Sequence, residues 1–296
     1  MSGARARPRA AHMQAAVGGS GLGAGSVPAR PHRAIAGRRR GCFDARPPVM
    51  PEAPTPTTEP VDRRGRLRAF VDAHPLAAEL TPRRLSRVVE VLERRLGSVT
   101  LVMENLSDPH NVSAVLRTAE GLGLSELHVV EQPNRWEKNK QISMGAERWI
   151  EVVRHQGLAR CAGDLAARGF SLWCADVGEG CVPVDEVPIE GKVALVFGSE
   201  HAGLSKRALS LADGRFTIPM AGFVESFNVS VSAALAIYDV ATRRRHHLAR
   251  VGRERGDLDD AALLDRADLY LRRAVRNVEL IRQLEAQGVL PPRPPG

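Results

Sequence analysis

The feature that most constrains the fold is a regular alternation of short apolar runs and helical patterns, which begins at residue 99. Apolar, β-branched runs of this length are typical of buried strands, and the helical patterns between them supply the crossovers that parallel strands need. The alternation therefore predicts an α/β domain with a mainly parallel sheet and helices on both faces. The expected strands are 99–103, 127–130, 149–153, 170–175, 193–197 and 215–218, and the expected helices are 111–122, 157–168, 203–211 and 228–248.

Length and composition limit the class of protein. The chain has 296 residues and 43% apolar residues, enough for a packed core. No apolar run approaches the ~20 residues of a membrane span, and the Arg-rich start lacks the apolar block of a secretory signal, so we expect a cytoplasmic protein that does not interact with membranes. The four cysteines form no Cys-x-x-Cys pair, which predicts reduced thiols and no metal site.

Composition also divides the chain into four parts. Residues 1–62 are rich in Gly, Ala, Pro and Arg and predict a disordered low-complexity segment, within which Met50 is an alternative start. Residues 63–97 predict a basic helical extension, in which Thr81 and Pro82 open a helix that runs to about residue 96. Residues 98–249 are the expected α/β domain. Residues 250–296 are a second basic extension, with one amphipathic helical stripe from residue 261 to 284.

Charge is concentrated in the two extensions. Residues 63–96 carry nine basic and four acidic side chains, residues 97–242 carry twelve and eighteen, and residues 243–296 carry twelve and eight. Dense basic flanks favour a polyanion such as RNA, although charge runs are also common on solvated faces, and an Arg bias accompanies GC-rich codons. The candidate RNA-binding residues are Arg83, Arg84, Arg87, Arg94, Arg95, Arg272 and Arg273.

One glycine-rich stretch, residues 176–180, superficially resembles a nucleotide-binding turn. Pro183 follows it closely, so no helix can begin there to present its N-terminus to a phosphate, and we interpret the stretch as a surface turn.

Three other polar stretches adjoin expected strand ends. Residues 109–119 begin a helix that Asn111 can cap, with Arg117 on the face opposite its buried stripe. Residues 197–205 place Gly198 and Glu200 beyond a strand's carboxyl end, where open α/β sheets bind ligands. Residues 218–237 form a loop that leads through Ser226 and Asn228 into an apolar helix. Each stretch also has a purely structural interpretation, as a cap, a turn or a core helix.

Together, in this order, these stretches resemble the SPOUT superfamily of methyltransferases, and within it the SpoU/TrmH tRNA 2′-O-methyltransferases. The similarity covers roughly residues 81–250. It rests on Asn111 with Arg117, on Gly-x-Glu-x-x-Gly-Leu-Ser at 198–205, and on Ser-x-Asn-Val-Ser-Val at 226–231. The resemblance implies a C-terminal trefoil knot, S-adenosylmethionine as cofactor and a homodimer. The knot could not have been expected otherwise, because unknotted chains are the overwhelming prior.

The resemblance also implies roles for particular residues. It assigns catalysis to Arg117, assisted by Asn111, Glu200, Ser226 and Asn228. An arginine keeps its proton at ordinary pH, so we interpret Arg117 as a clamp on an RNA phosphate that stabilises the developing alkoxide. Two cofactor positions depart from the family pattern, Phe227 where Leu is usual and Ala175 where Thr is common. The cofactor would lie against Ala175, Gly198, Ile218, Met220 and Phe227.

The expected function is therefore S-adenosylmethionine-dependent 2′-O-methylation of a D-loop guanosine in tRNA, at a position of the 18 type. Two alternatives stay open at this point. One is the same chemistry on another tRNA site or on ribosomal RNA, and the other is an RNA-binding homologue without turnover. We expect no accessory RNA-binding domain of ~75 residues before the catalytic domain, which disfavours the ribosomal-RNA members that carry one.

Overall fold

The computed structural model describes residues 62–106, 108–130, 144–199, 202–253 and 256–293, all within one compact unit, Thr58–Gly296. The low-complexity segment expected over residues 1–62 lies outside these ranges except for its last residue. Among the described helices, none is both long and apolar enough to cross a membrane.

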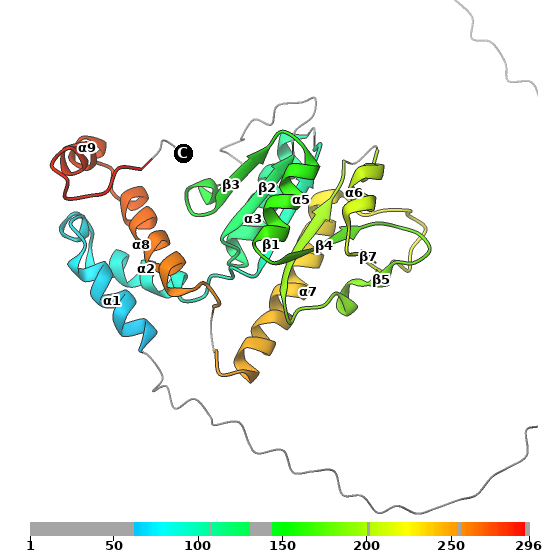
Figure 1. The fold of residues 1–296 in the computed structure, drawn as a ribbon, viewed down its shortest axis with the longest axis horizontal. Coiled ribbons are helices and arrows are strands. Elements are labelled where there is room, and N and C mark those ends of the chain that lie inside the picture. Colours follow the sequence, from blue (N-terminus) through cyan, green and yellow to red (C-terminus); the bar gives the residue numbers. More distant parts are fainter. Residues whose placement is uncertain (1–61, 107, 131–143, 200–201, 254–255, 294–296) are drawn as a thin grey trace, which may run out of the picture. The chain divides into compact units, whose positions relative to one another are not determined.

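In the described part of the chain, seven strands form one sheet in the order β3-β2-β1-β6-β4-β7-β5, and each pair of neighbours runs parallel (Figure 1). The predicted parallel α/β fold is confirmed. The third strand begins two residues later than expected, and a two-residue strand at the sheet edge was not predicted. The strands are β1 (Val99–Glu104), β2 (Glu126–Val130), β3 (Glu151–His155), β4 (Phe170–Ala175), β5 (Val182–Pro183), β6 (Lys192–Phe197) and β7 (Gly214–Thr217).

Helices cover both faces of the sheet, as Figure 1 shows. On one face, α3 (Pro109–Gly121) and α7 (Val229–Arg250) pack against strand residues such as Leu101. On the other, α5 (Leu158–Ala167) and α6 (Lys206–Leu211) pack against alternate residues such as Val102. Successive side chains of a strand point to opposite faces, so a strand covered on both sides is apolar throughout, which is why these runs were readable from sequence.

Two helix ends differ from expectation. The N-cap of α3 is Asp108, whose carboxylate accepts the His110 N–H at 2.8 Å, and Asn111 lies inside the first turn instead of capping it. Thr81 does cap α2 (Pro82–Leu92), but this helix ends four residues earlier than predicted, because Leu96 already bridges to Leu124 beside the sheet.

The two terminal extensions share one hydrophobic core. Side chains of α1 (Arg63–Ala73) and α2 pack with those of α8 (Asp260–Ala274), so the N-terminal and C-terminal helices stabilise each other. The prediction of a single helix from residue 261 to 284 is wrong. The structure has two helices there, because Asn277 caps a second one, α9 (Val278–Ala286), by accepting the Leu280 N–H at 3.0 Å. The expected boundaries of the α/β domain, between residues 97 and 98 and between residues 249 and 250, stay a prediction.

Two arginines expected to bind RNA are buried instead. Arg95 is 1% exposed and donates to the carbonyl oxygen of Leu124 at 2.8 Å and to the Glu120 carboxylate at 2.7 Å. Arg272 is 8% exposed, and its Nε lies 2.9 Å from both carboxylate oxygens of Asp268. Both guanidinium groups are committed to internal partners, so neither is available to a nucleic acid. Helical spacing predicted Arg95 on an exposed helix face, and this prediction is wrong because α2 ends at Leu92, before Arg95.

Asp268 gives the terminal helices a measurable dependence on acid. Burial alone would raise the pKa of its carboxyl, but hydrogen bonds from His74 and Arg272, with the charges of Arg272 and Arg293, outweigh burial and lower the pKa to about 2. Because the folded pKa lies below its ordinary 3.8, Asp268 stabilises the protein above pH 4, and this stabilisation is lost as the pH falls towards 2.

We therefore expect Asp268→Asn to lower the free energy of unfolding at pH 7 by about 2 kcal/mol or more, and to flatten its loss between pH 4 and pH 2. Urea denaturation across this range measures both effects. Asp72→Asn is the matched control, because Asp72 pairs with Arg68 on the surface, and its loss should cost less than about 0.5 kcal/mol. An Asp268→Asn protein with the wild-type acid profile would contradict this role.

Candidate functional site

A cavity of about 380 Å³ lies beyond the carboxyl ends of β4, β6 and β7. Strand β4 ends at Ala175, β6 leads into Gly198, and β7 leads into Ile218, so three segments distant in sequence meet at one edge of the sheet. This is where open parallel sheets bind ligands, because the loops that follow the strands are free of the ladder and can present backbone and side-chain groups.

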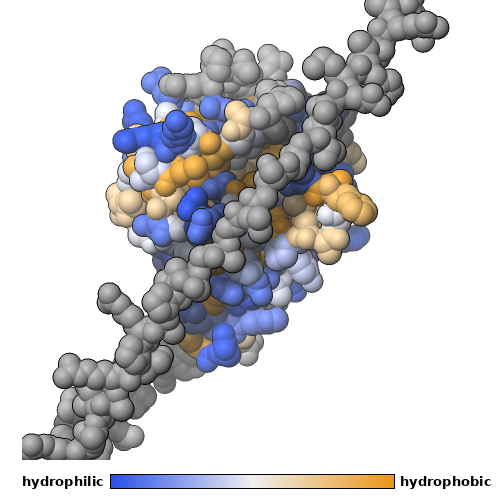
Figure 2. All heavy atoms as spheres, turned by 90° about the vertical axis from the view of Figure 1, so that its right-hand side faces the viewer, coloured by the Kyte–Doolittle hydropathy of each residue, from blue (hydrophilic) through white to orange (hydrophobic). Residues whose placement is uncertain are grey.

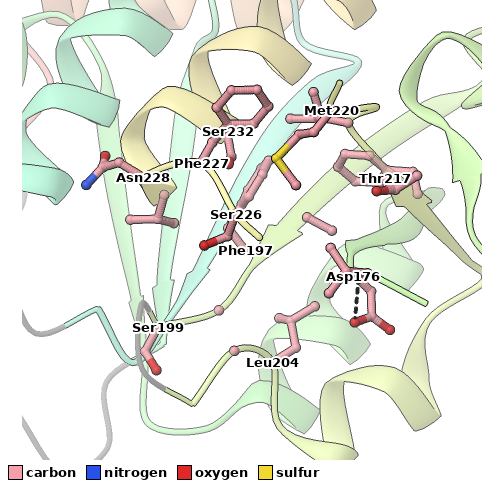
Figure 3. A pocket seen from close by; sticks show the side chains of 17 residues that line it. Asp176, Phe197, Ser199, Leu204, Thr217, Met220, Ser226, Phe227, Asn228 and Ser232 are labelled. Carbon is pink, nitrogen blue, oxygen red and sulfur yellow. Dashed lines mark hydrogen bonds between the residues drawn. The ribbon is translucent and has the colours of Figure 1, made fainter. Parts of the chain in front are cut away.

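The structure brings together most of the residues predicted from sequence. Figure 3 shows the labelled side chains surrounding the cavity, with Asp176 and Thr217 at one side and Asn228 at the other. The predicted residues that line the cavity are Ala175, Gly198, Ile218, Met220, Ser226, Phe227 and Asn228. Glu200 lies outside the described residues, so its assignment stays a prediction.

Sequence reasoning missed Glu104, which holds one wall of the cavity. Glu104 ends β1, is 4% exposed, and accepts two hydrogen bonds from Ser205, one from its N–H at 2.9 Å and one from its hydroxyl at 2.7 Å. The Ser205 hydroxyl oxygen in turn accepts the Ala208 N–H and caps α6. A buried carboxylate needs such partners, so this pair anchors the segment after β6 to β1. The available signal was an acid at the end of an otherwise apolar run.

The segment between β6 and α6 folds back on itself at a close backbone approach. Ser199 and Gly203 exchange two backbone hydrogen bonds, at 3.1 and 2.9 Å, and Gly203 has a φ of 63°. A Cβ atom on Gly198 would lie 2.2 Å from the carbonyl carbon and oxygen of Gly203. Glycine is therefore required at residue 198 for the chain to turn beside the cavity.

A pair of asparagines joins the other two segments. The side-chain amide of Asn228 donates to Asn111 Oδ1 at 3.1 Å, while Asn228 Oδ1 accepts the Ser230 N–H at 2.9 Å and caps α7. Asn228 thus links the N-terminal turns of α3 and α7 and fixes the last residues of the cavity loop. The structure brings Asn111 and Asn228 into direct contact, although Asn111 does not cap its own helix.

The lining is chemically mixed. Phe197 and Phe216 meet edge to face with ring centroids 6.0 Å apart, and Met220 adds a polarisable thioether. Asp176 and Thr217 add oxygen atoms at the same cavity. Asp176 belongs to the stretch interpreted as a surface turn. No α-helix begins at Pro183, but a short 3₁₀ helix, Val184–Glu186, does follow it, and the first two residues of the stretch line the site. Such a lining fits a ligand with a flat heterocycle and several polar groups.

Arg117 does not line this cavity within one chain. It lies exposed on α3, six residues after Asn111 on the same helix. Beside it, Ala114, Thr118 and residues of α7 line a shallow apolar groove. The side of α7 that faces this groove exposes three large side chains at helical spacing, Val231, Leu235 and Tyr238.

Comparisons with known proteins agree with this geometry. The profile of the SpoU rRNA Methylase family matches residues 98–238. A tRNA (guanosine(18)-2'-O)-methyltransferase of Escherichia coli is 33% identical over 182 residues, which are 62% of this chain and 79% of the relative. The enzyme of the same name from Thermus thermophilus is 37% identical over 166 residues, 56% of this chain and 86% of the relative.

The fold has a solved counterpart. The crystal structure of the Aquifex aeolicus TrmH/SpoU tRNA modifying enzyme superposes with a TM-score of 0.59 and 26% identity, covering 65% of this chain and 97% of that one. The chain belongs to the SpoU methylase family, as the resemblance in its sequence indicated.

The close approach at Gly198 gives a direct test of the cavity wall. We expect Gly198→Ala to lower the free energy of unfolding by about 1–3 kcal/mol, because the added methyl group forces the Gly203 backbone away. Gly163→Ala is the control. Its Cβ would meet nothing within 4 Å, and replacing a helical glycine by alanine should stabilise the protein by about 0.5–1 kcal/mol. Denaturant titration measures both. Equal stability of Gly198→Ala and wild type would contradict the tight turn.

Proposed function

We propose that this protein is an S-adenosylmethionine-dependent tRNA (guanosine-2′-O)-methyltransferase that acts on guanosine 18 of the D-loop. The observation that carries the proposal is the cavity itself. All five residues predicted to hold the cofactor line it, together with Ser226 and Asn228. The relatives from Escherichia coli and Thermus thermophilus carry the name of this activity, and each is covered by this chain over more than three quarters of its length.

The cavity suits the proposed cofactor. Phe197, Phe227 and Met220 offer apolar surface for an adenine ring, and the loop from residue 218 to 228 lies outside helices and strands, so its backbone groups are free of any ladder. Asp176 and Thr217 offer hydrogen-bond acceptors for hydroxyl groups of a ribose. When bound, S-adenosylmethionine supplies an electrophilic methyl group.

The protein's part in the chemistry is positioning and charge stabilisation. The 2′-oxygen of the ribose must be aligned at near-attack distance, and its negative charge must be stabilised as the proton leaves. An arginine stays charged at ordinary pH and matches a phosphate with a planar fork of donors. We therefore assign Arg117 to the RNA phosphate next to the reacting ribose and to the developing alkoxide, with the proton leaving to phosphate or water.

For Arg117 to reach a cavity it does not line, we infer a homodimer. The exposed stripe of Val231, Leu235 and Tyr238 borders α3 on the side of Arg117, and α7 begins directly after the cavity loop. A second copy is the occupant that suits this groove, because a symmetric contact there buries both stripes and carries each Arg117 towards the cavity of its partner. Figure 2 shows hydrophobic side chains gathered in patches between hydrophilic ones on the face that it draws.

For tRNA binding we propose the exposed arginines of the N-terminal extension, Arg83, Arg84, Arg87 and Arg94. Arg84 lies over the ring of Trp149, with its central carbon 5.3 Å from the ring centroid, which adds a stacking surface. Arg273 is partly buried and donates to the Arg148 carbonyl oxygen at 2.9 Å, so we assign it a minor role in tRNA binding.

A tRNA substrate also implies that the protein acts in the cytoplasm. The proposal needs no metal ion for methyl transfer.

Methyl transfer to defined RNAs tests the proposal. We expect wild-type protein to transfer a methyl group from S-adenosylmethionine to a tRNA transcript, with mass spectrometry locating one 2′-O-methyl group on guanosine 18. Transcripts with another base at position 18, or fragments of ribosomal RNA, should accept none. Arg117→Ala should lower kcat about a hundredfold or more with little change in cofactor affinity. Methylation at another tRNA site or on ribosomal RNA would replace the substrate, and cofactor binding without any turnover would favour the RNA-binding homologue.

Mixed dimers test whether Arg117 serves the partner's cavity. Arg117→Ala and Asn228→Ala chains, each impaired alone, are co-expressed with different tags and the mixed dimer is isolated. We expect about half of wild-type activity, because one cavity then keeps its own Asn228 and receives the partner's Arg117. If both groups act within one chain, neither cavity is complete and the mixture stays inactive.

Two further variants show whether the groove is the dimer contact. Leu235→Arg on both chains should give monomers in analytical ultracentrifugation and abolish the restored activity. Val278→Arg replaces an apolar residue that is also exposed, on α9, and should leave the dimer intact.

A further inference from the structure

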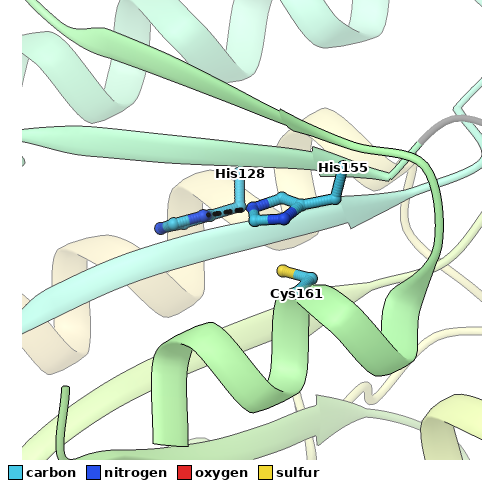
Figure 4. A group of neighbouring side chains, drawn as sticks. All are labelled: His128, His155 and Cys161. Atoms are coloured by element: carbon cyan, nitrogen blue, oxygen red, sulfur yellow. Dashed lines mark hydrogen bonds between the residues drawn. The ribbon is translucent and has the colours of Figure 1, made fainter. Parts of the chain in front are cut away.

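Two histidines and a cysteine meet in the interior, on the face of the sheet that α5 and α6 cover. His128 lies on β2, His155 ends β3, and Cys161 lies on α5, which packs across both strands (Figure 4). His128 Nδ1 and His155 Nε2 are 2.9 Å apart, and a ligand atom of each of the three residues lies within 4.8 Å of the other two. All three side chains are buried, so the groups are held in place by the surrounding core.

Each histidine has a carboxylate on its outer nitrogen. Glu126 Oε1 lies 3.2 Å from His128 Nε2, and Asp164 Oδ2 lies 3.7 Å from His155 Nδ1. When Glu126 accepts from His128 Nε2–H, the lone pair of His128 is on Nδ1, which accepts the Nε2–H of His155. A metal ion between the rings would replace this hydrogen bond, and the proton of His155 would move to Nδ1, on the side of Asp164. Histidines that bind metal ions are oriented in this way, with the second nitrogen donating to a carboxylate.

A zinc site needs neutral imidazoles and a thiolate. Burial lowers the pKa of His155, as does the nearby His128. Burial raises the pKa of Cys161 to about 12, so without a cation this thiol stays protonated and is a poor nucleophile. A divalent cation bound beside it displaces the thiol proton and compensates the buried charge.

We propose that His128, His155 and Cys161 bind one Zn²⁺ ion, through Nδ1, Nε2 and Sγ respectively. Two imidazoles and a thiolate are a donor set that Zn²⁺ accepts in tetrahedral geometry, with a water molecule as the fourth ligand. Bonds of about 2.0–2.1 Å from zinc to each nitrogen place the two nitrogens roughly 3.3 Å apart. The two nitrogens, 2.9 Å apart, therefore need to separate by only a few tenths of an ångström.

The position of the cluster points to a structural role. Strand β3 is at the edge of the sheet, and the ion would tie it to β2 and to α5. The proposed methyl-transfer cavity lies beyond β4, β6 and β7, which are other strands. The two histidines are separated by 27 residues, and the cluster has no Cys-x-x-Cys pair, so cysteine spacing alone pointed away from a metal site.

The test uses untagged full-length protein. After exposure to Zn²⁺ and removal of excess ion, elemental analysis should find about one zinc per chain, and Zn²⁺ should raise the melting temperature of protein treated with a chelator. With Co²⁺ in its place, the protein should show the absorption band of thiolate-to-cobalt charge transfer. Wild-type protein that neither retains zinc nor shows this band would overturn the proposal.

Matched variants locate the ion. Cys161→Ser and His155→Gln should lose the zinc and its effect on melting, whereas Cys174→Ser, a buried cysteine of the same core, should keep both. Equal zinc content in Cys161→Ser and Cys174→Ser would place the ion elsewhere and contradict the proposal. If Cys161→Ser fails to fold, as circular dichroism would show, the wild-type cobalt spectrum decides, because only a thiolate ligand produces the charge-transfer band.

Discussion

The site depends on one buried carboxylate. Glu104 ends the central strand β1 and, because it is shielded from water, requires hydrogen-bond donors to offset the loss of hydration. Ser205 supplies both, and each hydrogen bond to a charged group contributes about 1.5–3 kcal/mol. The same serine caps α6, so strand, turn and helix are fixed together. Without this anchor, the segment that leads from the turn at Gly198 to α6 would lose its link to β1.

The cavity follows from two such local constraints acting on opposite walls. Glu104 holds the segment after β6, and the Asn111–Asn228 hydrogen bond holds the loop before α7. Parallel strands bring these loops to one edge, and the two polar links hold them there. Partly buried hydrogen bonds therefore fix both walls of the cavity.

The sequence predicted the fold well and the site in part, for physical reasons. Strands buried on both faces are apolar throughout, so they could be recognised locally, and β5, with two residues, could not. The cofactor residues lie in stretches whose composition is unusual, and the structure gathers them at one cavity. Arg95 was misplaced because a helical pattern says nothing beyond the helix end, and its partners at Leu124 and Glu120 lie more than twenty residues away. Glu104 and the histidine pair likewise depend on contacts between distant segments.

The central claim is that the cavity beyond β4, β6 and β7 holds the methyl donor. The most direct measurement is a crystal structure of the protein with S-adenosylmethionine. We expect the cofactor between the turn at Gly198 and the loop that carries Met220 and Phe227, with the Asn111–Asn228 hydrogen bond intact. Cofactor bound at any other surface, or a cavity without cofactor in crystals grown at saturating concentration, would contradict it.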